Sequence, residues 1–518
     1  MMTKKYNEGS KGFSMIYDTI DTLVPEDHIV RKYEKAIDWS FIYPLVEPLY
    51  SNIGAPSIDP VVLFKMAFLV YLSGVGSMRK LCEEIQVNLA YRWFLHIDFC
   101  NTVPNYSTFS QNLSRKFLKD NNPELFEKIF NHILNEAIKN DFIDPTSIYI
   151  DGTHVKASAN KKKYNDVVIK IASKRYKEDL KKSIDEDRKK HNKKPFNHND
   201  DEDNHDDEDN NGFNIKSTDE MVKDEQGEEV VSIIYNDNGK KIGYKTVDRE
   251  TGEIKKRLVN ENYRRIKQSK TDKECGLYNK GEHEKVFAYN TSIAVDKNCY
   301  ILSCAVTAGN IHDSVSFYEL EDELKKQRFY KHVNNYVMDA GYKAPGIMKY
   351  LIDNKKEPLI PYTRPKTKKG YFKKYEFVYD EIEDYYICPG DYILLYSTTT
   401  KEGYREYKAE KEVCAKCPLR EKCTNSKQGK VIIRHVWEEY MEKAEENRYR
   451  LEYQGTYKKR KETVERVFGE GKENYGLRYT KVRGKARVKA ALLLTFASMN
   501  LKKIARWKSK KQRLVLNN

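Results

Sequence analysis

Three acidic residues stand at the ends of predicted strands or on a predicted helix, and their carboxylates are of the kind that bind Mg²⁺. Asp151 closes a strand within SIYIDGTHVKA, and Asp339 closes another within NNYVMDAGY. Glu465 lies on a helix within VERVFGEGK. Ligands of an α/β sheet sit at the carboxyl ends of its strands, and carboxylate oxygens suit Mg²⁺ together with substrate phosphates. Two such ions would stabilise the attacking and leaving oxygens of an in-line phosphoryl displacement.

Only the tertiary structure can bring these acids together, because they are 188 and 126 residues apart. The chain has 78 Asp and Glu residues, so spacing alone does not single out these three. Glu462 competes with Glu465 for the third position. We favour Glu465 because the apolar Val464 and Val467 beside it would anchor its helix.

Four of the nine cysteines form a second candidate site in a turn-rich segment. They follow a C-x25-C-x2-C-x5-C spacing and are Cys388, Cys414, Cys417 and Cys423. Four thiolates can close a tetrahedral structural zinc site, and C-x2-C is a usual half-site. The second half of the spacing is irregular, so free reduced thiols are the alternative. The odd total of cysteines favours a reduced intracellular chain over a disulfide framework.

The elements that would position these residues begin with helices. Asp59 and Pro60 are suited to start a helix, and VVLFKMAFLVYL after them is apolar all round, as in a buried helix. A Gly-containing break leads to a second amphipathic stretch, MRKLCEEIQVNLAYRWFLHI. The pair resembles a helix-turn-helix, although helix pairs occur in many α domains. A further helix is predicted to begin at Ser107, with that serine as its cap.

Strands follow, because the apolar period changes to two. We predict strands at 147–157, 286–296, 300–309 and 334–342, and a helix from Asp313 to about Gln327. This order indicates a mixed α/β sheet. Asp313 is expected to cap its helix, and we assign it no catalysis. His154 is either a neighbour of the acid site, a DNA contact or a structural histidine.

The composition along the chain predicts five parts. Residues 160–284 are charged, include the acidic run DDEDNHDDEDN at 200–210, and are expected to be partly helical (165–190) and partly disordered. The full division is a helical DNA-binding or dimerisation domain at 1–140, the first part of the catalytic core at 141–159 and 285–360, this insertion at 160–284, a β-rich Cys insertion at 361–435, and a catalytic helix with a basic helical region at 436–518.

The charge favours a polyanionic partner. The formal net charge is +15 and the pI is about 9.0. Residues 453–518 contain 19 Lys or Arg and four Glu, which is typical of a phosphate-contacting face or of a solvated helix surface. No apolar run approaches the roughly 20 residues that cross a bilayer, and we expect neither a signal peptide nor a membrane partner.

Four sequence motifs, in this order, resemble the DDE transposases of bacterial insertion sequences, and the IS1182-like group (IS4/IS5-related) in particular. They are YIDGTHVKASAN, FAYNTSIAVD with VTAGNIHDS, VMDAGYKAP, and RKETVERVFGEGKENYGLRYTKVRG. The resemblance implies an RNase H-like mixed-sheet core in which Asp151, Asp339 and Glu465 bind two Mg²⁺ (or Mn²⁺) ions. It implies cleavage of transposon ends and transfer of the freed 3′-hydroxyl strand to target DNA.

One departure from the resembling families concerns the signature Y-x2-R-x3-E-x6-K around the glutamate. Lys472 lies at the expected distance after Glu465, whereas Tyr457 and Arg460 are each one residue early. One residue rotates a helical side chain by about 100°, so the roles of Tyr457 and Arg460 are left open. The basic residues expected to contact DNA are Lys472, Arg478, Arg483 and Lys485, unless they form a solvated face.

The sequence therefore predicts a transposase acting on double-stranded DNA, both the terminal inverted repeats and the target. The resemblance implies a homo-oligomer on DNA, located in the bacterial cytoplasm with the nucleoid. One alternative is a catalytically inactive, transposase-derived DNA-binding protein. Another is an RNase H-like nuclease that does not join the cut strand to a target.

Overall fold

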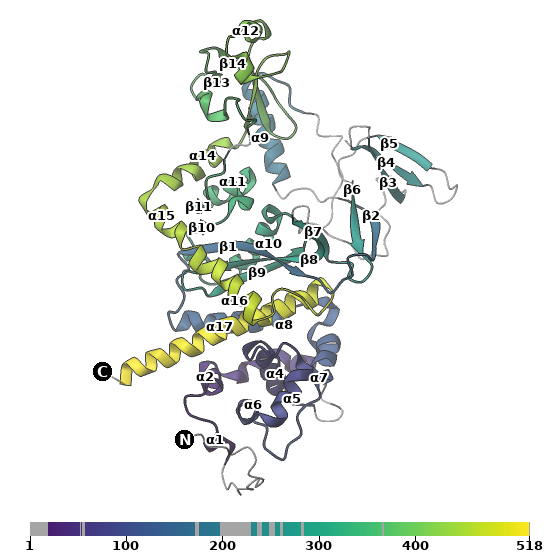
Figure 1. The fold of residues 1–518 in the computed structure, drawn as a ribbon, viewed down its shortest axis with the longest axis vertical. Helices are drawn as coiled ribbons and strands as arrows, with labels where there is room; N and C mark the ends of the chain where they lie inside the picture. Colours follow the sequence, from purple (N-terminus) through teal and green to yellow (C-terminus); the bar gives the residue numbers. More distant parts are fainter. Residues whose placement is uncertain are drawn as a thin grey trace, which may run out of the picture. The chain divides into compact units, whose positions relative to one another are not determined.

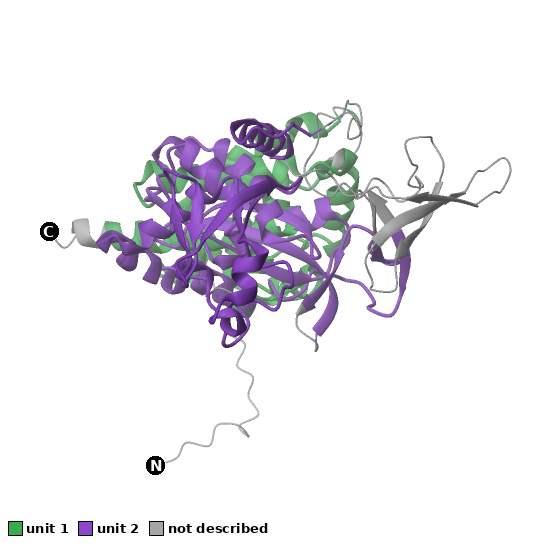
Figure 2. Ribbon diagram, turned by 90° about the horizontal axis from the view of Figure 1, so that it is seen from above, with its two compact units in different colours: residues 1–142, 473–476, 490–518 green, residues 143–472, 477–489 purple. Residues whose placement is uncertain are grey.

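The chain divides into two compact units in a computed structural model of all 518 residues (Figure 2). Unit 1 comprises residues 1–142, 473–476 and 490–518, and unit 2 comprises residues 143–472 and 477–489. Each unit is described by itself. The structure describes every residue except 1–18, 52, 54–56, 171–175, 197–228, 236–240, 248–253, 259–262, 281–283, 365–366 and 517–518.

Unit 1 is helical. Its α4 begins after Asp59, whose side chain accepts a hydrogen bond of 2.7 Å from the Val61 amide, and every residue from Leu63 to Leu69 is buried. The capping serine predicted at Ser107 is wrong, because Asn105 caps α7. The helices described are α1 (Ile20–Leu23), α2 (Ile29–Ala36), α3 (Ile42–Val46), α4 (Pro60–Leu72), α5 (Met78–Val87), α6 (Leu89–Leu95), α7 (Tyr106–Asn112) and α8 (Glu124–Lys139).

Unit 2 is built on a six-stranded mixed sheet (Figure 1). Its strands are β1 (Ser147–Lys156), β7 (Gly276–Lys280), β8 (Glu284–Val295), β9 (Ile301–Ala308), β10 (Asn335–Val337) and β11 (Glu357–Leu359). The order is β11-β10-β1-β8, with β9 and β7 both paired to β8. Strands β1, β10 and β11 are parallel, and β8 is antiparallel to β1 and to β9. The chain is thus a mixed α/β protein with a helical N-terminal region.

Two helices lie against this sheet. α10 (Asp313–Lys325) packs on β8 and β9, and α11 (Pro345–Asp353) packs on β11. All eight residues of β9 are buried, as expected of a strand at the centre of a core. Because β9 is antiparallel to β8 and β8 is antiparallel to β1, the carboxyl ends of β1, β9 and β10 meet at the same edge of the sheet.

The segment between β1 and β8 contains strands that the sequence did not predict. The helix expected over 165–190 is wrong in its first part, because residues Tyr164–Lys170 form β2, where Val167, Val168 and Ile169 favour a strand and pair with β6. The later part is α9 (Lys177–Lys190). The other strands are β3 (Glu229–Tyr235), β4 (Lys241–Val247), β5 (Ile254–Leu258) and β6 (Tyr263–Ser269). The acidic run 200–210 lies outside the described residues.

Residues 378–435 form a separate antiparallel sheet of five strands, which Figure 1 draws beside α9. The strands are β12 (Val378–Asp380), β13 (Tyr385–Ile387), β14 (Ile393–Thr399), β15 (Tyr404–Lys408) and β16 (Val431–His435), with α12 (Lys411–Lys416) and α13 (Arg420–Cys423) before the last. Its core includes Tyr386, Leu394 and Tyr407. Helix α9 is tied to this sheet by an ion pair of 2.6 Å between buried Asp187 and Arg405.

The C-terminal part is helical. It comprises α14 (Glu438–Glu446), α15 (Leu451–Lys458), the π-helical turn η10 (Lys461–Glu465), α16 (Arg466–Asn474) and α17 (Lys485–Leu516). Helix α17 begins directly after Gly484, which has a φ of 89° that favours glycine. Within the described residues, no helix is both long and apolar enough to span a membrane.

Candidate active site

Two parallel strands place Asp151 and Asp339 next to each other. In the register of β1 with β10, Tyr149 lies opposite Val337, and each aspartate follows its strand partner by two residues. Side chains alternate along a strand, so Asp151 points to the same face as Tyr149. Asp339 caps the short helix η7 (Ala340–Tyr342) and accepts a hydrogen bond of 2.8 Å from the Gly341 amide.

The charges of these residues act on one another. Burial raises the pKa of Asp151 to about 6, the negative charges of Asp339 and Asp313 raise it as well, and the Arg460 guanidinium lowers it. Its side chain is 19% exposed. The edge of the sheet therefore holds more negative charge than Arg460 compensates, which is the electrostatic environment that binds cations.

Arg460 joins the first and third predicted acids. Its Nη2 lies 2.8 Å from the Asp151 Oδ2, and its Nη1 lies 3.3 Å from the Glu465 Oε1. The Arg460 side chain is only 12% exposed. The structure thus brings Asp151, Asp339 and Glu465 to one place in unit 2, although they come from β1, the end of β10 and η10.

A π-turn accounts for the unusual spacing between Arg460 and Glu465. Residues 461–465 form η10, in which the Glu465 amide bonds to the Arg460 carbonyl, five residues earlier, at 3.4 Å. A π-turn holds one more residue than an α-turn, so the extra residue of this sequence is absorbed. Arg460 therefore stays on the face of Glu465, and the 100° rotation expected from an unbroken α-helix does not occur.

Tyr457 belongs to the same site. Burial raises the pKa of its hydroxyl, Arg460 lowers it, and the charges of Asp339, Glu465 and Asp151 raise it further. The charges of all three acids therefore act on this hydroxyl. Both residues that were one position early in the sequence, Tyr457 and Arg460, lie beside the acids in the structure.

The structure favours Glu465 over Glu462. Both side chains are exposed, but among the described residues no contact joins the Glu462 carboxylate to Arg460 or Asp151. Its backbone carbonyl accepts a bond of 3.3 Å from the Cys299 thiol. The two glutamates are three residues apart, and the π-turn directs the later one to the guanidinium.

Asp313 lies close to the predicted acids, a position that the sequence analysis did not predict. The expectation that it caps α10 is wrong, because His312 is the cap and its ring nitrogen accepts from the Ser314 amide at 3.2 Å. Asp313 instead accepts a bond of 2.9 Å from the Asn290 amide group. The sequence signal that could have identified Asp313 was its place after a strand. It follows β9, whose carboxyl end lies at the same edge of the sheet as those of β1 and β10.

The four predicted DNA contacts all lie in unit 2 but in different environments. Arg478 and Arg483 are exposed, and the Arg483 Nε donates to the Ser158 carbonyl at 3.0 Å. Lys485 is half-buried with its Nζ 3.5 Å from Glu319, and the Lys472 Nζ lies 5.9 Å from the centre of the Phe468 ring.

The segment from Arg478 adjoins the end of β1, because backbone bonds of 3.1 and 2.9 Å join Lys156 to residues 478 and 480.

His154 is held as a structural histidine. Its ring stacks on Tyr278 with centroids 3.5 Å apart, and its Nε2 lies 3.1 Å from the Gly309 carbonyl oxygen. Both contacts are made within the sheet region. They leave no need for a catalytic role to explain its position.

The four predicted cysteine ligands line one small cavity. Cys388, Cys414, Cys417 and Cys423 are half-buried free thiols around a volume of about 20 Å³. Burial raises the pKa of the Cys423 thiol, and the other three thiols raise it further. In the described part of the chain, however, no three His, Cys, Asp or Glu side chains are already arranged to hold a metal ion.

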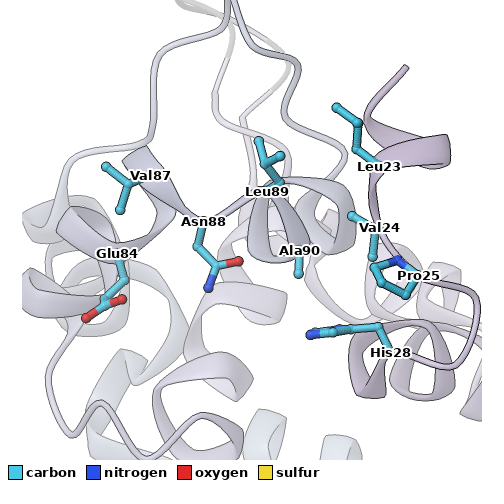
Figure 3. A pocket seen from close by; sticks show the side chains of 9 residues that line it. All are labelled: Leu23, Val24, Pro25, His28, Glu84, Val87, Asn88, Leu89 and Ala90. Atoms are coloured by element: carbon cyan, nitrogen blue, oxygen red, sulfur yellow. The ribbon is translucent and has the colours of Figure 1, made fainter. Parts of the chain in front are cut away.

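A larger groove, of about 430 Å³, lies in unit 1 (Figure 3). Leu23, Val24, Pro25 and His28 line one side of it, and Glu84, Val87, Asn88, Leu89 and Ala90 line the other. None of the residues predicted to do chemistry lies in it. The candidate site lies in unit 2, and this groove lies in unit 1.

Comparisons with known families agree with this reading of the chain. Residues 18–115 match a transposase domain (DUF772), and residues 387–505 match a transposase DDE domain. The second match includes Glu465 and begins at residue 387, so Asp151 and Asp339 lie outside it. No curated protein and no solved structure matches the chain. The IS1182-like subgroup stays a prediction. On the two domain matches, the chain is a DDE transposase of an insertion sequence.

Proposed function

We propose that the chain cleaves DNA at the ends of its element and transfers the freed 3′-hydroxyl strand to target DNA. The observation that carries the proposal is the convergence of Asp151, Asp339 and Glu465 around Arg460, in a chain with a DDE domain. The strand order β9-β8-β1-β10-β11, with two antiparallel and two parallel pairings, supports an RNase H-like core.

The chemistry of the donor set suits divalent cations, although among the described residues no three of these carboxylates are already gathered around one point. Three carboxylates with a raised Asp151 pKa and a cationic side chain between two of them form a site that is complementary to positive charge. Asp151, Asp339 and Glu465 would hold Mg²⁺ or Mn²⁺, as hard oxygen ligands do. When bound, two such ions supply charge stabilisation for the attacking and leaving oxygens.

The chain's own residues position the DNA. Arg478 and Arg483 are exposed on the segment that adjoins the end of β1, and we propose that they contact phosphates of the bound strand. Lys485 and Lys472 stand on the same part of the chain. Arg460 holds Asp151 and Glu465 together, and the charges of the three acids act on the Tyr457 hydroxyl. Assembly as a homo-oligomer on DNA stays a prediction.

The test is an assay of the full-length chain on a duplex that carries the DNA flanking its gene, with Mg²⁺ or Mn²⁺. We expect cleavage at the element end and joining to a target plasmid. Asp151→Asn, Asp339→Asn and Glu465→Gln should each lower the rate at least about 100-fold, as the loss of one charged transition-state contact does. Glu462→Gln is the matched control and should stay within a few-fold of the wild type.

Three outcomes separate the alternatives. Cleavage without joining would identify a nuclease. Binding of the duplex without nicking, with all variants folded, would identify an inactive DNA-binding protein. Retained activity in Glu465→Gln with loss in Glu462→Gln would overturn the assignment of the third acid.

We also propose that the four cysteines bind structural Zn²⁺. Cys388 follows β13, Cys414 and Cys417 lie in and at the end of α12, and Cys423 ends α13. All four line one cavity, and zinc needs four sulfurs at about 2.3 Å from one point. Rotation of the four half-buried cysteine side chains would bring their sulfurs to that distance from one point. A domain with a core this small would gain much of its stability from a bound zinc ion.

Metal analysis of the purified chain tests the zinc site. We expect about one zinc per chain, and loss of it in Cys414→Ser and Cys423→Ser, because a structural site needs all four ligands. Cys100→Ser removes an exposed free thiol outside the cluster and should retain the zinc. Zinc-free protein with four reactive thiols would establish the free-thiol alternative.

A further inference from the structure

Asp313 lies at the same edge of the sheet as the two aspartates. It is the first residue of α10, and α10 follows β9, whose carboxyl end meets those of β1 and β10. The Asn290 Nδ2 donates to its Oδ1 at 2.9 Å and fixes the carboxylate. Asn290 comes from β8, the neighbour of β1, where it pairs with His154. The carboxylate is therefore held from the sheet and not by its own helix.

Two glycines give this carboxylate room to approach the other acids. A Cβ on Gly341 would lie 3.0 Å from the Asp339 Oδ1 and 3.2 Å from the Asp313 Oδ2. A Cβ on Gly152 would lie 3.1 Å from the Asp313 Oδ1. Gly152 directly follows Asp151, and Gly341 lies two residues after Asp339. The Asp313 carboxylate therefore lies close to the backbone beside both predicted aspartates.

One fully buried polar atom at this place, the Asn290 Oδ1, has no hydrogen-bond partner among the described residues. It lies 3.1 Å from the Cβ position of Gly152, and the buried Tyr342 hydroxyl lies 3.6 Å from the same point. Burial raises the pKa of Tyr342 well above its ordinary value, the charges of Asp313, Asp151 and Asp339 raise it further, and a hydrogen bond with the Ser292 side chain lowers it. Buried polar groups are nearly always bonded, so the Asn290 Oδ1 indicates a ligand or its water at this point.

We propose that Asp313 is a fourth carboxylate of the divalent-ion site, held in place by Asn290. This inference rests on the proposed function, because the ions are those of the DNA-cutting site. Mg²⁺ keeps several waters when protein carboxylates bind it. The Asn290 Oδ1 would accept a hydrogen bond from such a water. The acid at the start of α10 thus adds to the three acids implied by the resemblance.

The first experiment measures Mn²⁺ binding to the full-length chain by electron paramagnetic resonance, without DNA and therefore without turnover. Asp313→Asn keeps the shape and the oxygen that accepts from Asn290, and removes only the charge. We expect its Mn²⁺ affinity to fall by tenfold or more, the scale of losing a partner of a metal site. Asp322→Asn, about 13 Å further along the same helix, is the control and should bind as the wild type does.

A second pair of variants changes the geometry and keeps every charge. Gly341→Ala would push a methyl group against the carboxylates of Asp339 and Asp313 and should weaken Mn²⁺ binding. Gly469→Ala in α16 meets open space and should not. The unfolding midpoint of each variant shows whether it is folded, and this pair answers the question even if Asp313→Asn folds poorly.

The outcomes distinguish this inference from the proposed function. If Asp151→Asn weakens Mn²⁺ binding while Asp313→Asn and Gly341→Ala bind as the wild type does, the role of Asp313 is wrong and the three-acid site stands. If Asp151→Asn also has no effect, the divalent-ion site itself is wrong. Weaker binding in Asp151→Asn, Asp313→Asn and Gly341→Ala, with both controls unchanged, supports the four-carboxylate site.

Discussion

Arg460 and Asp151 form an ion pair of 2.8 Å that joins the C-terminal helices to the first strand of the sheet. Both side chains are largely buried, so the pair is poorly screened by solvent. The same guanidinium reaches Glu465 at 3.3 Å. Arg460 thus neutralises part of the negative charge that the proposed ions would neutralise. It also links β1 to η10, two segments that are distant in the sequence.

Replacing Arg460 should make the stability of the chain depend on divalent ions. In Arg460→Ala, Asp151 loses the cation that lowers its pKa, while burial and the charge of Asp339 still raise it. We expect a lower unfolding midpoint at neutral pH, and a larger increase on adding Mg²⁺ than in the wild type. Thermal unfolding with and without Mg²⁺ measures this.

Arg466→Ala is the control for that experiment, because Arg466 is an exposed arginine one residue after η10. It should show the Mg²⁺ response of the wild type. An equal Mg²⁺ response in Arg460→Ala and the wild type would contradict the idea that the guanidinium and the ions share the same carboxylates.

Metal binding should weaken in acid because Asp151 takes up a proton. Its pKa rises from an ordinary 3.8 to about 6 in the folded chain, so below about pH 6 a metal ion must displace that proton. The Mn²⁺ affinity should then fall by up to about tenfold per pH unit, as one displaced proton requires. The same shift favours folding below about pH 4, and this contribution is lost as the pH rises through 6.

Binding titrations at pH 5, 6 and 7.5 check this pH dependence. Asp151→Asn cannot take up the proton, and its weaker affinity should change less over the same range. A wild-type affinity that is constant from pH 5 to pH 7.5 would rule out Asp151 as the titrating ligand.

Deletion of Lys461 tests the π-turn. Without this exposed residue, the turn can close as an ordinary α-turn, with Arg460 and Glu465 still on one face. We expect the DNA-cleaving activity to stay within about tenfold of the wild type, since no charged contact is lost. Deletion of Gly469 in α16 instead rotates Lys472 by about 100° relative to Glu465 and should reduce activity much further.

Activity assays of the two deletion variants test this prediction, and circular dichroism shows whether each variant is folded. If both are folded and the Lys461 deletion is as inactive as the Gly469 deletion, the π-turn does more than absorb one residue. The extra residue would then be required for the geometry of the site.

The buried Asp187 should be essential for attaching α9 to the five-stranded sheet. It is 3% exposed and bonds to Arg405 at 2.6 Å and to the Thr399 hydroxyl at 2.5 Å. Asp187→Ala leaves the Arg405 charge without its partner, and we expect a loss of about 3 kcal/mol in the free energy of unfolding. Urea unfolding measures the change.

Glu186→Ala removes the exposed acidic neighbour on the same helix and should change stability by less than about 0.5 kcal/mol. Limited proteolysis gives a second reading, since a detached α9 would be cut sooner. Equal stability of Asp187→Ala and Glu186→Ala would mean that other contacts hold the helix.

The sequence by itself determined the local structure and the candidate acids. The stretch around Asp151 is a strand, although Asp151 is its fifth residue of ten and not its last. The strand predicted at 334–342 is wrong beyond Val337, because Asp339 caps a short helix there. The apolar run after Asp59 is a buried helix, as predicted. Local periodicity and capping residues encode such elements directly, because each depends on neighbours a few positions away. The motifs also identified the transposase family, which the domain matches support.

Only the tertiary structure decided which side chains meet. Strand order and register bring Asp313 to the edge that holds Asp151 and Asp339, although the sequence suggested a helix cap. The π-turn directs Glu465, and not Glu462, to Arg460. The first relationship joins strands and a helix that are separated in the sequence, and the second depends on one inserted residue. No local pattern specifies long-range pairing or where a helix absorbs an insertion.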